Sequence, residues 1–126
     1  LMGIRSEEQL SVHPLRGNLF ENMVINDFQK YYFNRAERAD LFFYRDKGQH
    51  EVDLLQMNAD GKIHAYEIKA SMTYRNDFFD GLHYIQNLLK DNFISGSLLY
   101  DGVQESIQQY DSYCNYRNFP KLLRRS

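Results

Sequence analysis

The first strong pattern in the chain is an apolar stripe with helical spacing. The stripe consists of Phe20, Val24, Phe28 and Tyr31. Intervals of three and four residues place side chains on one face of an α-helix. We therefore predict an amphipathic helix that ends near Asn34.

Four apolar segments downstream have the character of β-strands, and a second helical stripe precedes the last of them. The predicted strands span residues 41–44, 50–57, 62–70 and 94–100, which are rich in aromatic and β-branched side chains. The second helical stripe consists of Phe78, Leu82, Ile85 and Leu89. In the tail we expect one or two short edge strands around residues 107–116 and a brief turn around residues 120–123. The order α-β-β-β-α-β predicts an α/β fold with a mixed central sheet flanked by helices.

Side-chain alternation gathers charged residues on the second and third predicted strands. On the third strand Glu67 and Lys69 share one face, about 6.6 Å apart along the strand. On the second strand the alternation assigns one side to Glu51, Asp53, Leu55 and Met57. His50 then falls on the opposite side from Asp53, so we expect it to be solvated or to cap a turn rather than to share a metal ion.

The loop between these two strands decides whether Asp53 faces Glu67. A two-residue loop at positions 60–61 would put the two carboxylates on opposite faces of the hairpin. A three-residue loop at positions 59–61, with Gly61 in the left-handed conformation, puts Asp53 directly opposite Glu67. Asp-Gly is the more common signal for a two-residue loop. A shared site at the two carboxylates therefore requires the less common loop.

In the register of the longer loop, Asp53 and Glu67 converge with Lys69 beside them. Two carboxylates a few ångströms apart repel each other unless a cation lies between them, and hard oxygen ligands suit Mg²⁺ or Mn²⁺. Such a metal ion polarises a phosphate and lowers the pKa of a bound water. Lys69 could orient or deprotonate that water, or stabilise charge on phosphorus. We predict Asp53, Glu67 and Lys69 as catalytic residues, with Asp53 and Glu67 as the metal ligands.

Glu21 is the fourth candidate catalytic residue. It falls at the edge of the apolar stripe of the first helix, where a carboxylate needs a partner, so it could assist the metal site. Each of these charged residues also has a plainer interpretation. Alternating charges on a strand are commonly a solvated face, and Glu51 opposite Lys69 would form a surface ion pair worth less than about 1 kcal/mol. The site hypothesis rests on the combination of residues in this order of elements.

Length and composition narrow the class of protein further. A chain of 126 residues suits one domain, and its formal net charge of −2 argues against strong nucleic-acid binding by the domain alone. The single cysteine, Cys114, rules out an internal disulfide and suits a cytoplasmic location. We find no apolar run long enough for a membrane span, no secretory signal and no phosphate-binding loop for ATP.

The acidic residues and the lysine, in this order, resemble the pattern of the PD-(D/E)xK nuclease superfamily. That pattern is an acidic residue on a leading helix, an Asp on a strand and Glu-x-Lys on the next strand, here Glu21, Asp53 and residues 67–69. The resemblance implies a restriction-endonuclease-like core, a Mg²⁺ or Mn²⁺ cofactor and DNA as a partner.

A longer set of segments carries a more specific resemblance. Residues 17–24, 43–46, 51–53, 67–71 and 96–102 are together similar to the C-terminal domain of a prokaryotic family of AAA-type ATPases, a domain of unknown function. The resemblance implies a single domain over residues 1–126. Residues 1–13 would lead in from an N-terminal ATPase module, which would be a partner, and residues 103–126 would form edge strands and a tail. Assembly into a homo-oligomer stays open.

Two functions are compatible with these observations. The first is a Mg²⁺-dependent DNA nuclease, which the complete acidic-acidic-lysine set favours. The second is a non-catalytic module that binds nucleic acid or a protein partner, or mediates assembly, for the ATPase; the acidic net charge favours it. Carboxylates within reach of one metal ion beside a cleft would favour the enzyme. A buried Glu67–Lys69 ion pair without a cleft would favour the module.

Overall fold

A computed structural model describes residues 19–35 and 40–123 of the chain. Its longer elements are α1 (Leu19–Asn34), β1 (Asp40–Arg45), β2 (Glu51–Met57), β3 (Ile63–Lys69), α2 (Asp80–Leu89), β4 (Phe93–Tyr100), β5 (Ser112–Asn115) and α3 (Pro120–Leu123). Short 3-10 helices precede α2 (η1, Asn76–Phe79), β4 (η2, Lys90–Asn92) and α3 (η3, Tyr116–Asn118). The lead-in predicted over residues 1–13 lies outside the described residues.

The described strands form one mixed sheet in the order β1-β2-β3-β4-β5. The pairs β1–β2 and β2–β3 are antiparallel, whereas β3–β4 and β4–β5 are parallel. Parallel neighbours need a crossover connection, and α2 lies in the one between β3 and β4. The predicted α/β class and the order α-β-β-β-α-β are confirmed, as are an edge strand within residues 107–116 and a short helical turn at residues 120–123.

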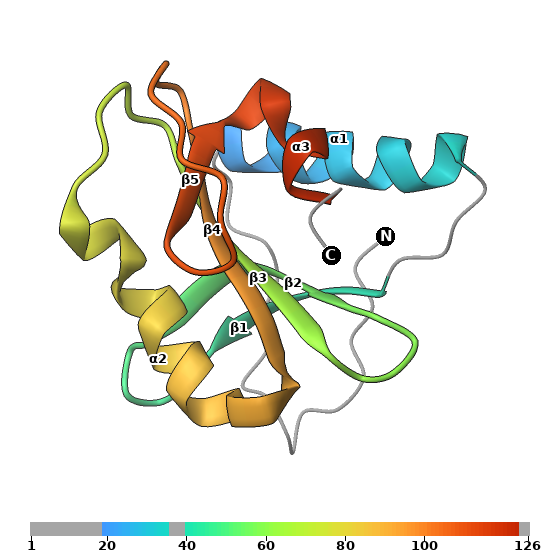
Figure 1. Ribbon diagram of the computed structural model, residues 1–126, viewed down its shortest axis with the longest axis vertical. Helices are drawn as coiled ribbons and strands as arrows, with labels where there is room; N and C mark the ends of the chain where they lie inside the picture. The colour runs from blue at the N-terminus through green and yellow to red at the C-terminus, as the bar shows by residue number, and fades with distance from the viewer. Residues whose placement is uncertain (1–18, 36–39, 124–126) are drawn as a thin grey trace.

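Helices cover both faces of the sheet, with α1 and α3 on one side and α2 on the other (Figure 1). On the first side, Phe28 of α1 packs edge-on against Tyr66 and stacks on Phe119, with ring centroids 4.9 Å and 4.3 Å apart. On the second side, Leu82 and Ile85 of α2 are buried in the other core cluster. Each fully buried aliphatic or aromatic side chain of this kind contributes about 1.5–3 kcal/mol.

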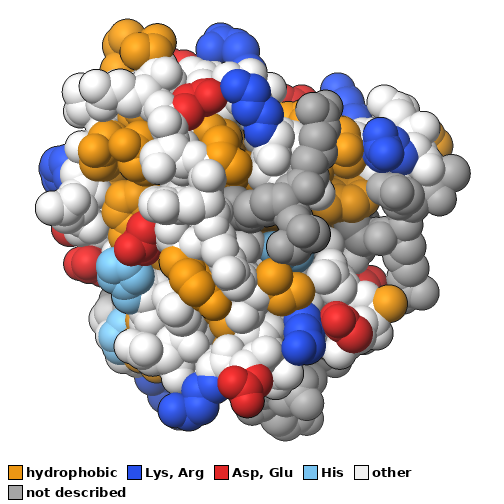
Figure 2. All heavy atoms as spheres, in the orientation of Figure 1, with side chains coloured by type: hydrophobic (Ala, Val, Ile, Leu, Met, Phe, Trp, Pro, Cys, Tyr) orange, Lys and Arg blue, Asp and Glu red, His pale blue; other side chains and the backbone are white. Residues whose placement is uncertain are grey.

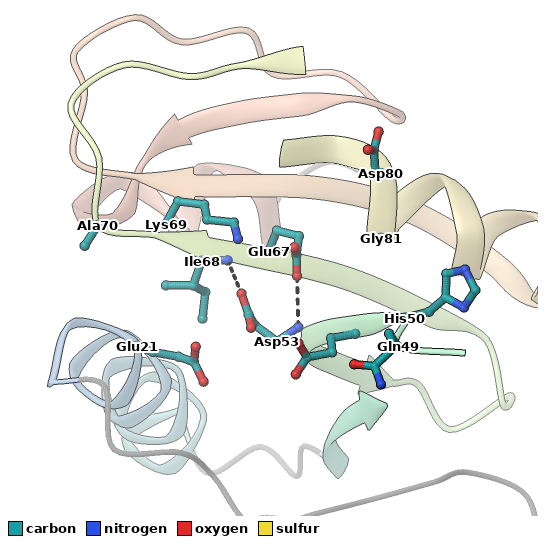
Figure 3. A pocket seen from close by; sticks show the side chains of 11 residues that line it. Glu21, Gln49, His50, Asp53, Glu67, Ile68, Lys69, Ala70, Asp80 and Gly81 are labelled. Carbon is teal, nitrogen blue, oxygen red and sulfur yellow. Dashed lines mark hydrogen bonds between the residues drawn. The ribbon is translucent and has the colours of Figure 1, made fainter. Parts of the chain in front are cut away.

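The hairpin between β2 and β3 has the longer of the two loops considered. The backbone N–H of Asn58 donates to the carbonyl of Lys62 at 2.8 Å, and Gly61 has a φ of 83°. Leu54 therefore pairs with Tyr66, and the same register continued by one residue places Asp53 opposite Glu67. The three-residue loop with a left-handed Gly61 is confirmed, and Figure 3 shows the two carboxylates lying across from each other.

A β-bulge interrupts β2 at Asp53. Phe42 pairs with Leu55 but Tyr44 pairs with Val52, so Asp53 and Leu54 together lie opposite a single residue of β1. The regular alternation predicted along β2 is therefore wrong at this point: Val52, which it assigned to the side opposite Leu55, packs into the same core cluster as Leu55. Bulges commonly change the direction of a side chain beside a functional site.

The surface carries mixed charge. On the face that Figure 2 draws, Lys and Arg side chains are scattered over the outline, with Asp and Glu side chains among them. None of the helices in the described ranges is long and apolar enough to cross a membrane.

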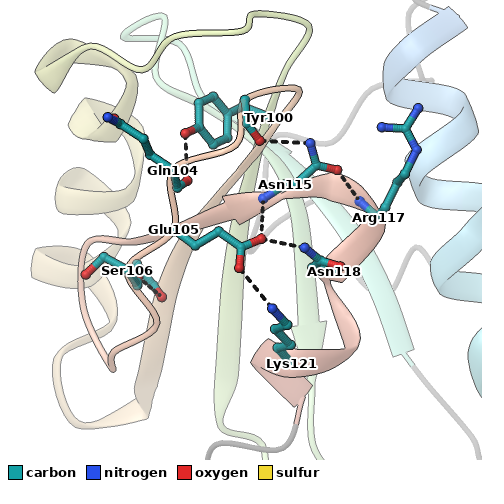
Figure 4. A network of polar contacts seen from close by, with 10 residues as sticks. Tyr100, Gln104, Glu105, Ser106, Asn115, Arg117, Asn118 and Lys121 are labelled. Atoms are coloured by element: carbon teal, nitrogen blue, oxygen red, sulfur yellow. Dashed lines mark hydrogen bonds and ion pairs between the residues drawn. The ribbon is translucent and has the colours of Figure 1, made fainter.

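One side chain, Glu105, fastens the loop after β4 to the end of the described chain (Figure 4). Its carboxylate accepts hydrogen bonds from the backbone N–H of Asn115 at 3.3 Å and from the side-chain amide of Asn118. It also lies 3.0 Å from the ammonium group of Lys121 in α3. The tail, which has little regular structure of its own, is thus held by polar contacts.

Glu105→Ala should lower the free energy of unfolding by about 1–3 kcal/mol, because it leaves the donors of Asn115 and Asn118 without their acceptor. Urea denaturation measures this difference. Lys121→Met is the matched control and should cost less than about 1 kcal/mol, since the Lys121 side chain is 51% exposed. An alanine variant as stable as the parent would show that the tail does not depend on Glu105.

Candidate active site

Asp53 and Glu67 are joined through backbone groups where the β2–β3 pairing ends. The backbone N–H of Asp53 donates to Oε1 of Glu67 at 3.1 Å, and the backbone N–H of Ile68 donates to Oδ2 of Asp53 at 2.8 Å. The regular ladder reaches only as far as Leu54 and Tyr66. Beyond these two residues, a side-chain carboxylate rather than a backbone carbonyl accepts the hydrogen bond from the backbone N–H of the opposite strand.

These two carboxylates lie in the wall of a pocket of about 550 Å³. The pocket is lined by Glu21, Gln49, His50, Glu51, Asp53, Glu67, Ile68, Lys69, Ala70, Asp80 and Gly81 (Figure 3). All four candidate residues, Glu21, Asp53, Glu67 and Lys69, are therefore brought together from α1, β2 and β3. The wall is strongly acidic, because five of its side chains are carboxylates.

Burial makes the charged form of both carboxyl groups unfavourable, and the charge of Asp53 adds to this effect at Glu67. Burial raises the pKa of the Glu67 carboxyl well above its usual range, and the charge of Asp53 raises it further, while Lys69 acts in the opposite sense. Burial also raises the pKa of Asp53, against the Ile68 N–H and the Lys69 charge, which lower it. Glu67 is only 7% exposed. The pair therefore favours a positive partner, either a proton or a cation.

Glu21 contacts the pair from α1. Figure 3 shows the carboxyl groups of Glu21 and Asp53 pointing toward each other, and the Glu21 side chain acts to lower the pKa of Asp53. Glu21 thus belongs to the same acidic cluster as Asp53 and Glu67.

Helix α2 approaches the site closely because it has a glycine at its second position. A Cβ on Gly81 would lie 2.4 Å from the carbonyl oxygen of Glu51 and 3.7 Å from Oε2 of Glu67. The first of these distances is far inside van der Waals contact. Any side chain at Gly81 would push the start of α2 away from β2 and open the pocket.

Lys69 is held beside the carboxylates by an aromatic ring. Its ammonium nitrogen lies 5.5 Å from the centroid of Phe78, and the guanidinium carbon of Arg75 lies 5.0 Å from the same centroid. Arg75 is in turn held by two hydrogen bonds to Asp77. Cation–π attraction of this kind restricts where the lysine points.

His50 also lines the pocket, although the sequence argument left it outside the site. The expected turn-capping contact is present, since Nδ1 lies 3.1 Å from Oδ1 of Asp46. The sequence did not predict that His50 lines the pocket, because side-chain alternation was applied to a regular strand, whereas β2 contains a β-bulge. An Asp four residues before a His, in a turn that contains Gly48, is the one local signal that points to this contact.

The fold and the site together define an α/β domain with an acidic pocket at the β2–β3 hairpin. A family model described as Domain of unknown function (DUF4143) matches residues 16–119, which is most of the chain, and the chain belongs to this family. Searches of curated proteins and of solved structures found no significant match. The expected membership of a domain family of unknown function is confirmed.

Replacing Glu67 should change how the stability of the metal-free domain depends on pH. A carboxyl group with a raised pKa in the folded state stabilises fully below its unfolded pKa, and this contribution is lost as the pH rises through the folded pKa. Glu67→Gln keeps an acceptor for the Asp53 N–H and removes the charge. The variant should therefore gain stability relative to the parent as the pH rises from about 5 to about 8.

Urea denaturation in a chelator, across that pH range, measures the effect. Asp91→Asn, at an exposed position in η2, is the control and should differ from the parent by a constant amount. A pH-independent difference for Glu67→Gln would contradict the electrostatic strain assigned to the pair.

Proposed function

We propose that this domain hydrolyses phosphodiester bonds of DNA with a divalent metal ion, at a PD-(D/E)xK-type site on a restriction-endonuclease-like core. The observation that carries the proposal is the convergence of Asp53, Glu67 and Lys69 in one pocket. Glu21 approaches the same site from the leading helix. The adjoining cleft favours the enzyme over a structural ion pair.

The side chains present fit a metal ion that needs few protein ligands. Within the described ranges, no group of three or more His, Cys, Asp or Glu side chains is arranged to hold a metal ion. Mg²⁺ is commonly bound by one or two carboxylates, with water and substrate phosphate as the other ligands. Asp53 and Glu67, whose raised pKa values reflect the need for a positive partner, would hold it. Bound there, the metal would act as a Lewis acid toward a phosphate oxygen and a water.

The remaining residues have roles that follow from their positions. Lys69 provides the positive charge among the candidate residues, and it would stabilise negative charge on phosphorus or orient the attacking water. Glu21, which points toward Asp53 from α1, would assist in positioning it. The wall's described side chains include five acidic groups, and those that are charged repel a polyanion until a cation neutralises part of that charge. Metal binding should therefore precede DNA binding.

The wider setting is part of the same proposal. The resemblance to the C-terminal domain of AAA-type ATPases supports a domain that works with an ATPase module in the cytoplasm. Such a module would supply DNA affinity that a chain of net charge −2 lacks by itself.

The second candidate function is a non-catalytic binding or assembly module of such an ATPase. The scattered basic side chains in Figure 2 and the acidic pocket favour it. In that case Asp53 and Glu67 would hold a metal ion, or a proton, without turnover.

The test is cleavage of plasmid and single-stranded DNA by the purified domain in Mg²⁺ or Mn²⁺. Asp53→Ala and Lys69→Ala should each lower the rate by about 10²-fold or more, because each removes a group that acts on the transition state. Lys62→Ala is the matched control: it removes an exposed lysine just before β3 and should leave the rate unchanged.

Cleavage that persists in Asp53→Ala would overturn the assigned site. If the parent domain does not cleave, the assay is repeated with the longer protein that carries the ATPase module. Absence of metal-dependent cleavage in both would favour the non-catalytic module.

A further inference from the structure

His50 is fixed in one orientation at the pocket although much of it is exposed. Its ring stacks on Tyr84 of α2 with centroids 3.6 Å apart and planes 5° apart, and its Nδ1 lies 3.1 Å from Oδ1 of Asp46. These contacts come from two different elements. The His50 side chain nevertheless remains 43% exposed. An exposed ring held in this way is suited to contact a molecule that enters the pocket.

The carboxylate that orients His50 is itself strongly held. Oxygens of Asp46 accept hydrogen bonds from the Tyr44 hydroxyl at 2.9 Å and from the backbone N–H of Gly48 at 3.0 Å. Burial acts to raise the pKa of Asp46, but the hydrogen bonds from Tyr84, from the His50 backbone N–H and from Tyr44 outweigh it and lower that pKa overall. Asp46 is therefore an anion at neutral pH, ready to accept the Nδ1 proton of His50.

This contact determines what the other ring nitrogen can do. With Nδ1 donating to Asp46, Nε2 is the nitrogen available to a molecule in the pocket. When the imidazole is protonated, both nitrogens are donors. His50 then presents a charged N–H group of the kind that binds phosphate oxygens strongly.

The turn that presents His50 is strained. Gln49, the residue before it and another part of the pocket wall, has a φ of 70°. Left-handed backbone is uncommon for residues other than glycine, and such strain tends to occur at functional sites. The left-handed position in this turn is occupied by Gln49, and the glycine of the turn, Gly48, lies one position before it.

His50 and Lys69 lie on opposite sides of the carboxylate pair. Figure 3 shows Asp53 and Glu67 between them, with Lys69 at one end of the pocket and His50 at the other. A phosphate at the carboxylates would be next to Lys69 but separated from His50. A nucleic-acid strand, however, carries a further phosphate on the adjoining nucleotide.

We infer that His50, as the imidazolium, binds the phosphate next to the scissile one, so that the pocket takes a strand with consecutive phosphates. This inference rests on the proposed function, because it places the scissile phosphate at Asp53 and Glu67. The titratable groups of the described residues that share the pocket or contact the ring are Glu21 of α1, Asp46 of the turn, Glu51 and Asp53 of β2, Glu67 and Lys69 of β3, and Asp80 and Tyr84 of α2. Most of them are acidic, so among the described lining residues His50 and Lys69 are the ones that can offer a polyanion positive charge.

The test compares two probes in Ca²⁺ by NMR titration of the whole domain. One probe is a thymidine trinucleotide with two phosphodiesters, and the other is a thymidine dinucleotide with one. The parent should bind the trinucleotide more tightly by on the order of tenfold, as expected for one hydrogen bond between charged groups. His50→Phe, which keeps a ring to stack on Tyr84, should lose this advantage and bind the dinucleotide as the parent does.

His50→Gln keeps a neutral N–H donor and should retain part of the advantage. Urea denaturation of His50→Phe checks that the fold is intact.

Equal binding of the trinucleotide by His50→Phe and the parent would overturn the inference. So would an equal loss for both probes, which is the result of a purely structural role, and so would failure of the parent to bind either probe. Trinucleotide binding that depends on His50, in a domain that cleaves no DNA even with its ATPase module, would instead overturn the nuclease proposal and leave His50 as a phosphate-binding residue.

Discussion

The burial of two carboxyl groups, placed opposite each other by a hairpin register, is the constraint on which the site depends. Asp53 and Glu67 face each other because the β2–β3 loop has three residues and Gly61 adopts a φ of 83°. Within residues 19–35 and 40–123, no arginine or lysine forms an ion pair with either carboxylate; each accepts a backbone N–H from the opposite strand instead. These bonds satisfy the backbone, but burial still raises the pKa of both carboxyl groups, and the charge of Asp53 raises the pKa of Glu67 further.

Several features of the fold bring further groups to this pair. The bulge in β2 places two residues opposite one and changes the direction of the chain at Asp53. Gly81 allows the start of α2 to lie against β2, and α1 places Glu21 within hydrogen-bonding reach. The cores on the two faces of the sheet hold these elements in place, so that the pocket is formed by packed secondary structure. The packed cores thus stabilise a site in which burial makes charged carboxyl groups unfavourable.

The sequence predicted the elements well because their apolar patterns are strong. A helix is the natural interpretation of the stripe from Phe20 to Tyr31, and a strand is the natural interpretation of the apolar run of β4. The order of the motif residues predicted that Glu21, Asp53, Glu67 and Lys69 converge, provided that the hairpin has the three-residue loop. Other features depend on contacts between distant segments. The bulge at Asp53 is set by pairing with β1, and the place of His50 by Tyr84 of α2. The ion pair between Glu105 and Lys121 of α3 likewise has no periodic signal in the sequence.

The central claim, that Asp53 and Glu67 are two ligands of one cation, is tested most directly by locating Mn²⁺ in crystals of the domain from its anomalous scattering. The account predicts one strong peak between the two carboxylates, about 2.1 Å from an oxygen of each. A map with no peak there, with both carboxylates still bonded to the backbone N–H groups of Ile68 and Asp53, would contradict it.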